Sequence, residues 1–284
     1  MSGQRSRISR SQSLTQQVAR NVRNDIAAGV LRDGQPLPPT RELAEQWGVS
    51  VFTISEAMKL LADEGLIVSK PRAGRVVNAP EQAGRNEIRT RTPHVILIGG
   101  YAGSGKTELG RILARETGWP ILDKDTLTRP VVEVALEILG RSPHDRDSET
   151  YLSIIRPREY EALMSAMTEN VQCGTSAIVT APFIHELRDK AWIDRTIASC
   201  EAMNATLSIV WVHCDADTMH TYVRHRGAAR DSAKLENWDA YLGTIDLEFR
   251  PPVPHALIDN SASGVPLQTQ ARRLLTSIVG TDAY

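Results

Sequence analysis

Gly100-Tyr101-Ala102-Gly103-Ser104-Gly105-Lys106-Thr107 is a complete G-x-x-x-x-G-K-[ST] motif. It follows the apolar run 95–98 and precedes a helical apolar pattern, which is the strand–loop–helix context that this motif requires. Its glycines tolerate positive φ, so successive N–H groups can turn inward around a polyphosphate at a helix N-terminus. Lys106 is expected to reach the β- and γ-phosphates, and the Thr107 hydroxyl to hold Mg²⁺. We therefore predict a site for ATP or another purine nucleotide, contacted by Gly100, Ala102, Gly103, Ser104, Gly105, Lys106, Thr107 and Glu108.

Length and composition place limits on the rest of the chain. The 284 residues, 41% hydrophobic and 24% charged, predict about two globular domains. Apolar stretches are short and the first residues lack an apolar segment, so we expect a cytoplasmic protein without a membrane span or a secretory signal. Cys173, Cys200 and Cys214 are far apart and outside any C-x-x-C pattern, which argues against a disulfide framework or a zinc site.

The charge is distributed unevenly along the chain. Residues 1–91 hold 14 Lys and Arg against 9 Asp and Glu, although the net charge of the whole chain is −1. A basic N-terminal third suits a polyanionic partner, but it is also compatible with a merely soluble domain. Residues 1–12 are rich in Ser, Arg and Gln and lack apolar periodicity, so we predict a flexible basic arm there.

The apolar pattern of residues 13–78 predicts a winged helix-turn-helix domain. Apolar residues at a four-residue step from Leu14 to Ile26 indicate a helix, and a second helix is expected to stop at Gly48. Ser50 is placed to cap a third helix. Short strands at 66–68 and 75–77 are then joined by a basic hairpin. Residues 79–92 carry no periodicity and are predicted to be a linker.

Several segments of this domain resemble the GntR family of bacterial transcription regulators. They are LPPTRELA at 37–44, GVS at 48–50, TI at 53–54, EA at 56–57 and LADEGLI at 61–67. The resemblance implies operator binding as a homodimer, with the second and third helices and the wing at double-stranded DNA. The family usually has arginines where this chain has Val51 and Ser55, so readout is altered or rests more on phosphate contacts. The expected DNA contacts are Arg41, Thr53, Ser55, Lys59, Arg72 and Arg75.

A winged helix can also serve as a protein-binding module, because a fold does not dictate a function. That alternative stays open at this point.

Two aspartates follow the short strand 120–122 of the second domain. The carboxyl end of such a strand lies beside the phosphates in an open α/β sheet. We therefore predict that Asp123 and Asp125 are catalytic, one ordering Mg²⁺ and one accepting a proton from an acceptor hydroxyl, with Asp123 as a metal ligand. The alternative is that a loop aspartate caps the next helix. Many P-loop proteins carry an aspartate at the end of the strand that corresponds to 177–180. This chain has Thr180 there.

Residues 224–231 are arginine-rich around a glycine and suit a mobile lid. Arg224 and Arg230 are predicted to bind nucleotide and Arg226 to neutralise charge in the transition state, whereas the alternative is a solvated basic loop. Asn260 follows the last strand, and its loop is predicted to run beside the adenine. The charged and aromatic residues Arg156, Arg158, Glu159 and Tyr160 are interpreted as a helix surface, and the alternative is that they line an acceptor pocket.

Residues 93–284 are similar to the small P-loop kinases, the AAA-type group that holds shikimate and gluconate kinases, chloramphenicol phosphotransferase and zeta-toxin-like proteins. The resemblance implies an α/β fold, a parallel sheet with helices on both faces, that binds ATP with Mg²⁺. The leading hypothesis is a DNA-binding transcription regulator whose operator affinity depends on its nucleotide. The alternative is a kinase for a small-molecule acceptor that carries a DNA-binding domain, and the sequence leaves catalysis open.

Overall fold

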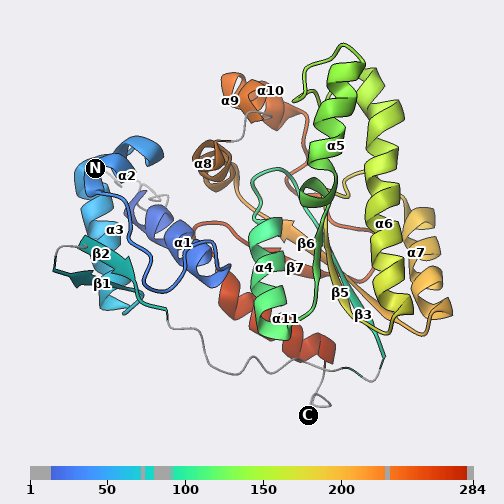
Figure 1. The fold of residues 1–284 in the computed structure, drawn as a ribbon, viewed down its shortest axis with the longest axis horizontal. Coiled ribbons are helices and arrows are strands. Elements are labelled where there is room, and N and C mark those ends of the chain that lie inside the picture. Colours follow the sequence, from blue (N-terminus) through green and yellow to red (C-terminus); the bar gives the residue numbers. More distant parts are fainter. Residues whose placement is uncertain (1–13, 72–73, 80–89, 91, 228–230, 280–284) are drawn as a thin grey trace, which may run out of the picture.

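The structure is a computed structural model of the 284-residue chain, and it describes residues 14–71, 74–79, 90, 92–227 and 231–279. The predicted arm 1–12, most of the predicted linker, Arg72 and Arg230 lie outside these ranges. The predicted fold class is confirmed: a small helical domain with a two-stranded wing is followed by an α/β domain (Figure 1). No helix in the described part of the chain has the length and apolar character needed to cross a bilayer.

The N-terminal domain packs its helices around one apolar core. Ile54, Ala57, Met58 and Leu61 of the third helix are buried in it, as the spacing predicts. The Ser50 side chain accepts a hydrogen bond from the Thr53 N–H at 3.0 Å and caps that helix. The wing strands pair antiparallel. The elements are α1 (Leu14–Ala27), α2 (Thr40–Trp47), α3 (Val51–Asp63), β1 (Ile67–Lys70) and β2 (Gly74–Val77).

The second domain is built on a parallel sheet. Within the described residues this sheet has five strands in the order β4-β5-β3-β6-β7. Its strands are β3 (His94–Gly99), β4 (Ile121–Asp123), β5 (Ala177–Thr180), β6 (Thr206–His213) and β7 (Ala256–Asp259). The connecting elements are α4 (Lys106–Thr117), α5 (Lys124–Ile138), the π-helix η1 (Tyr151–Ile155), α6 (Arg156–Gln172), α7 (Lys190–Ala202), α8 (Ala216–Arg226), α9 (Ser232–Glu236), α10 (Trp238–Gly243) and α11 (Leu267–Val279).

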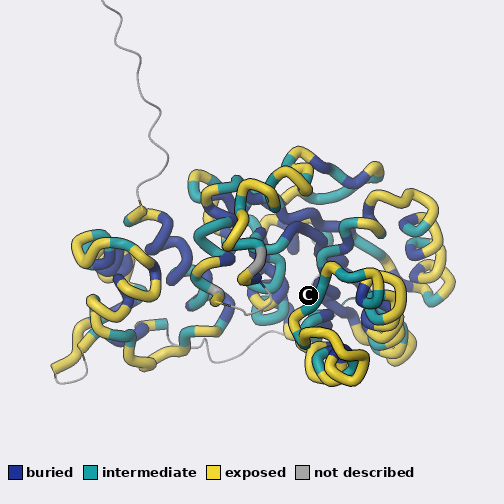
Figure 2. The backbone as a smooth tube through the Cα atoms, turned by 90° about the horizontal axis from the view of Figure 1, so that it is seen from above, coloured by how far each residue is buried: buried dark blue, intermediate teal, exposed yellow. Residues whose placement is uncertain are grey.

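The central strand β3 separates two apolar cores. Val95 and Leu97 face the core shared with α6 and α7, whereas Ile96 and Ile98 face the core shared with α4 and α11. All residues of β3 are buried, and the strands form the dark centre of the molecule in Figure 2. A parallel strand covered on both faces is expected to be a continuous apolar run, which explains the sequence of 95–98.

Helix α1 packs against both domains. Its apolar stripe lies in the core of the winged helix, but Gln17, Arg20, Asn21 and Asn24 are buried as well. Ala28, just after the helix, packs into the core that contains α4 and α11. Helix α1 accordingly lies between α3 and the α/β domain in Figure 1, and it is largely dark blue in Figure 2.

Candidate functional site: phosphate loop, acceptor cavity and DNA-facing surface

The phosphate loop connects the end of β3 with the start of α4. Gly103 and Gly105 have φ of 79° and 96°, in the left-handed region that the motif requires. A Cβ atom would lie 2.8 Å from the Met219 carbonyl oxygen at Gly103 and 2.1 Å from Asn260 Nδ2 at Gly105. Close neighbours thus leave no room for a side chain at Gly103 or Gly105, and they hold the loop in place. Lys106 Nζ donates to the Tyr101 carbonyl at 2.6 Å, across the same loop.

Asp123 joins the phosphate loop to the edge strand β4 and to its neighbour β5. Its Oδ2 atom accepts hydrogen bonds from Thr107 Oγ1 at 3.1 Å and from Thr180 Oγ1 at 2.7 Å. Its Oδ1 atom accepts the Thr126 N–H at 2.9 Å, so Asp123 also caps α5. The helix-capping interpretation of this aspartate is therefore confirmed, and its role as a metal ligand stays a prediction. Asp123 and Thr180 are paired in the register of β4 and β5, which explains how Asp123 supplies a carboxylate next to Thr180.

The donor set around Thr107 fits magnesium. Mg²⁺ in phosphoryl-transfer sites takes one or two protein oxygens and completes its shell with phosphate oxygens and water. Thr107 Oγ1 and Asp123 Oδ2 supply two such oxygens beside the phosphate loop. The described residues contain no cluster of three or more His, Cys, Asp or Glu side chains, so a cage made by the protein alone is not part of the described structure.

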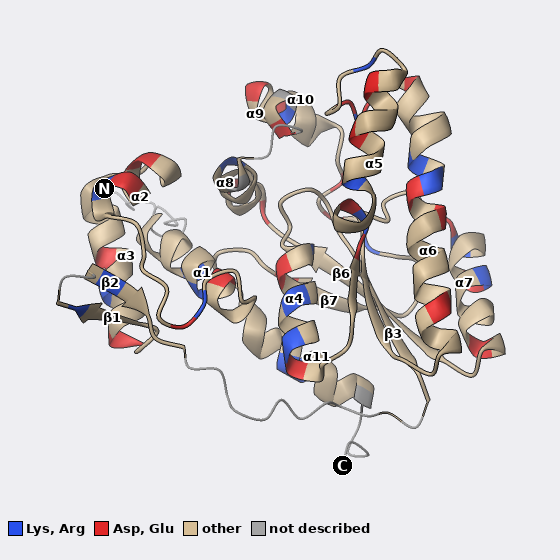
Figure 3. Cartoon of the chain, viewed as in Figure 1, with Lys and Arg blue, Asp and Glu red and all other residues tan. Residues whose placement is uncertain are grey.

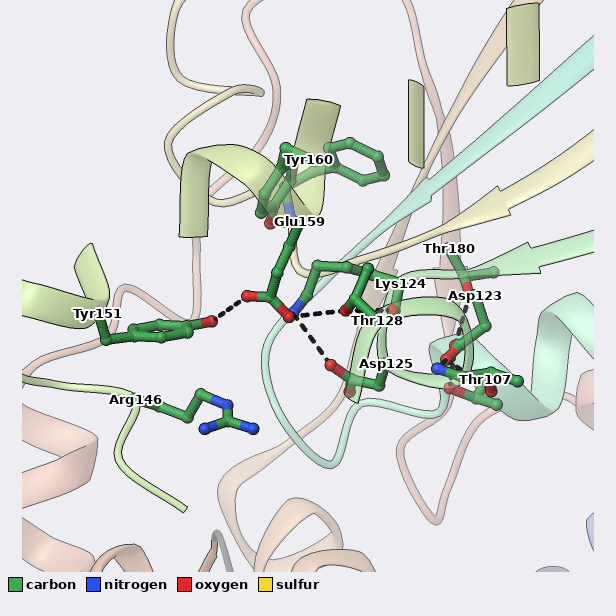
Figure 4. Close-up of polar contacts among 12 residues, drawn as sticks. Thr107, Asp123, Lys124, Asp125, Thr128, Arg146, Tyr151, Glu159, Tyr160 and Thr180 are labelled. Atoms are coloured by element: carbon green, nitrogen blue, oxygen red, sulfur yellow. Dashed lines mark hydrogen bonds and ion pairs between the residues drawn. The ribbon is translucent and has the colours of Figure 1, made fainter. Parts of the chain in front are cut away.

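A buried charged network lies beside this site (Figure 4). Lys124 is 5% exposed, and its ammonium lies 2.8 Å from Glu159 Oε1 and 3.0 Å from Asp125 Oδ1. Glu159 also accepts hydrogen bonds from Thr128 and Tyr151, at 2.8 and 2.7 Å. Burial and the Glu159 carboxylate raise the pKa of Tyr151 well above its usual value, so its phenol remains a donor. Asp125 is consequently held by Lys124 at the network's edge.

The interpretation of residues 156–160 as a helix surface is wrong for Glu159 and Tyr160, which are 3% and 8% exposed. Arg156 pairs with Glu186 at 2.8 Å, whereas the side chain of Arg158 is 78% exposed, as expected for a surface charge. The missed signal is the four-residue step 159, 163, 167, 171, which places Glu159 on the buried stripe of α6.

A cavity of about 780 Å³ opens from the phosphate loop toward this network. Its walls come from the loop and the start of α5, from η1 and α6, and from α9 and α10. Lys106, Thr107, Asp123 and Asp125 line it together, and their action on one substrate stays a prediction. Asp231 and Lys234 line its α9 side and form an ion pair at 3.2 Å, a feature that the sequence did not reveal.

Among the predicted lid and adenine residues, the structure places Arg224, Arg226 and Asn260. Arg224 directs its guanidinium to Gly48 of the winged helix, where a Cβ atom would meet its Nη2 atom at 1.9 Å. This position differs from the predicted one over the phosphates, because α8 packs against α2. Arg226 is the last residue of α8. Asn260 is fully buried and donates to the Ser104 carbonyl at 3.1 Å, so it touches the phosphate loop.

Two titratable side chains meet where the domains join. His225 of α8 stacks on Trp47 of α2, with ring centroids 3.4 Å apart, and lies 4.0 Å from Asp25 of α1. Burial lowers the pKa of His225 to about 4. Burial and the Glu108 charge raise the pKa of Asp25 to about 7, against a smaller opposing effect of Arg111. The interface therefore favours a neutral Asp25 and a neutral His225.

Asp25→Asn is expected to stabilise the protein more at about pH 8 than at about pH 5. A raised carboxyl pKa contributes stability that is fully present below the unfolded value of 3.8 and lost as the pH rises through about 7. Asparagine avoids this loss because it carries no charge. Thermal unfolding of the two proteins at both pH values measures the difference, with Asp63→Asn on the exposed end of α3 as the control. An equal shift at both pH values contradicts this prediction.

The predicted DNA contacts other than Arg72 lie on α2, α3 and the wing strand β2. Arg41 at the start of α2 and Lys59 on α3 are exposed, whereas Thr53 and Ser55 are half-buried. Arg75 of the wing donates to Thr40 Oγ1 at 3.0 Å, which ties β2 to the start of α2. Acidic and basic residues both occur along α2 and α3 in the cartoon of Figure 3. The side chain of Phe52 is 73% exposed on α3, a position from which an apolar group can contact a thymine methyl.

Comparison with known families agrees with this architecture. Residues 95–247, more than half of the chain, match the family model described as "AAA domain". The chain belongs to this AAA-domain family. Residues 14–77 match the model described as "Bacterial regulatory proteins, gntR family". The AAA-type domain thus follows a GntR-type helix-turn-helix domain, and both resemblances inferred from the sequence are confirmed.

Individual relatives match one domain at a time. The HTH-type transcriptional regulator GgaR of Escherichia coli is 33% identical over 81 residues, 28% of this chain and 33% of GgaR. A shikimate kinase of Moorella thermoacetica is 30% identical over 97 residues, 34% of this chain and 54% of the enzyme. A solved sugar kinase from Janibacter sp. HTCC2649 is 21% identical, with a TM-score of 0.43 over 68% of this chain and 99% of that one. This chain spans 14% to 54% of the length of the first curated relatives that it matches.

Proposed function

We propose that this protein is a DNA-binding transcription regulator whose AAA-type domain binds ATP, or a related purine nucleotide, with Mg²⁺. The observation that carries the proposal is the pairing of Thr107 with Asp123 beneath a complete phosphate loop, in the same chain as an exposed recognition helix. The main-chain N–H groups and Lys106 bind the polyphosphate. Nucleotide occupancy changes operator affinity through the packed boundary between the domains, where Trp47 stacks on His225.

The DNA-binding half acts as a homodimer, in keeping with GntR-type domains, so that two recognition helices reach successive major grooves of an operator. Arg41 and Lys59 contact phosphates, while Thr53, Ser55 and Phe52 face the base edges from α3. Arg75 and the predicted wing residue Arg72 follow the backbone. A recognition helix without the usual arginines depends strongly on its few phosphate contacts.

Arg41→Ala is expected to weaken operator binding about 10-fold and to lower the slope of log K against log salt by about 1, because it removes one phosphate contact. Fluorescence anisotropy over a salt series measures both quantities. Arg195→Ala, an exposed arginine on α7, is the matched control and leaves both unchanged. Equal salt slopes for wild type and Arg41→Ala contradict the assignment of this arginine.

The cavity favours a second function, phosphoryl transfer to a small hydroxyl-bearing acceptor. Asp125 lies on the cavity wall next to the phosphate loop and is positioned by Lys124, so it can accept the proton of an acceptor hydroxyl. Lys106 neutralises charge on the transferred group. Bound Mg²⁺ would supply further charge neutralisation at the phosphate oxygens, held by Thr107 and Asp123.

One experiment separates these functions. Binding to genomic fragments is measured with no nucleotide, ATP, ADP and a nonhydrolysable analogue, alongside ADP formation in the presence of candidate acceptors. A regulator changes its DNA affinity with the analogue, which requires no hydrolysis. Rapid acceptor-dependent ADP formation without an effect on DNA binding supports the kinase. No heat of binding with any purine nucleotide and magnesium contradicts both proposals.

A further inference from the structure

Helix α1 of the winged helix is seated on the loop that follows β7. The Arg20 guanidinium donates to the carbonyl oxygens of Gly264 at 2.7 Å, Val265 at 3.2 Å and Ala262 at 3.4 Å. Its Nη2 atom also lies 3.3 Å from Asn260 Oδ1. A planar group that donates to several carbonyls of one loop is thus held directly beside the phosphate loop, which Asn260 contacts through Ser104.

Helix α1 also contacts α8. Asn24 Nδ2 donates to the Tyr222 hydroxyl at 2.8 Å, and Thr221 Oγ1 donates to Gln17 Oε1 at 3.3 Å. Arg20 and Asn24 are one helical turn apart, so both project from the same face of α1. That face therefore fills the space between α8 and the loop 260–265.

The space that α1 fills and the open cavity lie on different sides of the phosphate loop. The cavity is lined by Tyr101, Ala102, Lys106 and Thr107 of the loop, and its lining includes no residue of α1, of α8 or of 260–265. A nucleotide with its phosphates in the loop must direct its base and ribose to one flank. The carboxylate-lined cavity suits the acceptor, which leaves the flank that α1 fills for the nucleoside.

The contact between α1 and the AAA-type domain is polar, and some of the buried polar atoms there have no hydrogen-bond partner. Among the described residues, the buried side-chain polar atoms without a hydrogen-bond partner are Arg20 Nε, Asn21 Oδ1, Ser104 Oγ and His225 Nδ1. Each of them belongs to α1, to the phosphate loop or to α8. A buried polar atom without a partner destabilises the state that contains it. A polar interface can also separate without exposing a large apolar surface.

The sequence predicts the adenine beside Asn260, and we infer that α1 closes this nucleoside half of the site, between the loop 260–265 and the facing side of α8. Arg20 then occupies the carbonyls that would accept hydrogen bonds from the amino edge of a purine. This inference rests on the proposed nucleotide binding and specifies how the bound nucleotide acts on the winged helix. A nucleoside and α1 compete, so nucleotide binding displaces the winged helix from the AAA-type domain, and the closed state lowers the apparent affinity for nucleotide.

The test uses the full-length protein, Mg²⁺ and two ligands, ATP and inorganic tripolyphosphate. Arg20→Ala removes the group that occupies the loop carbonyls, so it is expected to bind ATP about 10-fold more tightly than wild type. Tripolyphosphate has no base, so its affinity is expected to remain unchanged. Arg23→Ala is the matched control, because Arg23 lies on the same helix and pairs with Glu64 within the winged helix. Isothermal titration calorimetry measures all six affinities.

The possible results decide the two proposals separately. An ATP affinity that Arg20→Ala leaves unchanged or weakens overturns the competition and leaves nucleotide binding intact. No binding of either ligand to any of the proteins overturns the proposed function, and the competition with it. Where Arg20→Ala does not fold, His225→Ala replaces it, since it removes the ring stacked on Trp47. Hydrogen exchange of wild type gives an independent answer: ATP, but not tripolyphosphate, is expected to accelerate exchange in 14–27, and slower exchange there contradicts displacement.

Discussion

Lys106→Ala is expected to weaken ATP binding at least about 100-fold, which corresponds to about 2.7 kcal/mol. Lys106 is the first residue of α4 and lines the cavity beside Thr107. Its ammonium is therefore placed to make charge-assisted hydrogen bonds with the β- and γ-phosphates. Removal of one such partner from a partly buried site leaves the phosphate charge without compensation. Calorimetry with Mg²⁺·ATP measures the loss directly.

The control for this prediction is Lys190→Ala. Lys190 is an exposed lysine at the start of α7 and pairs with Asp194 on the surface, so its loss removes the same charge without touching the loop. Similar ATP affinities for Lys106→Ala, Lys190→Ala and wild type would show that the phosphate loop is not the nucleotide site. The DNA affinity of Lys106→Ala should also become insensitive to ATP, because the nucleotide no longer biases the two domains.

Glu159→Ala is expected to lower the free energy of unfolding by about 3 kcal/mol, and the melting temperature by about 10 °C. The substitution leaves the Lys124 ammonium, 5% exposed, without the carboxylate 2.8 Å away. It also removes the acceptor of the Tyr151 and Thr128 hydroxyls. Asp125 still faces Lys124, which keeps the expected loss at the lower end of the range for a broken buried pair.

Glu161→Ala is the matched control for Glu159→Ala. Glu161 lies on the same helix, but its side chain is 61% exposed and pairs with Arg158 at the surface, so the expected change is within about 0.5 kcal/mol. The double variant Lys124→Met/Glu159→Leu is expected to recover part of the stability, since it removes both buried charges. If Glu159→Ala and Glu161→Ala unfold at the same temperature, the network does not contribute to stability.

Local sequence patterns were sufficient for the architecture and for part of the site. The motif at 100–107 predicts a strand, a glycine-rich loop and a helix, and this local signal does not depend on the rest of the chain. Ser50 was identifiable as a helix cap because the cap and its partner are three residues apart. The spacing of apolar residues in α3 likewise predicted the core of the winged helix.

Contacts between distant segments could not be predicted in this way. Asp123 supplies the carboxylate beside Thr180 only because β4 and β5 pair in a register that places them side by side. Glu159 resembles a surface charge until Lys124, 35 residues away, is brought to it by the packing of α5 on α6. The placement of Arg224 depends on which domain its helix packs against, and no local pattern encodes that choice.

The amino-acid sequence by itself determined that this protein joins a winged helix to an α/β domain with a phosphate-loop motif, because both signals are periodicities and motifs within short segments. The tertiary structure alone decided that Arg20 meets Ala262, Gly264 and Val265 across more than 240 positions of chain. Such a contact depends on how two folded domains pack against each other. Its physical basis is the match between a guanidinium and a cluster of loop carbonyls, which exists only after both domains have formed.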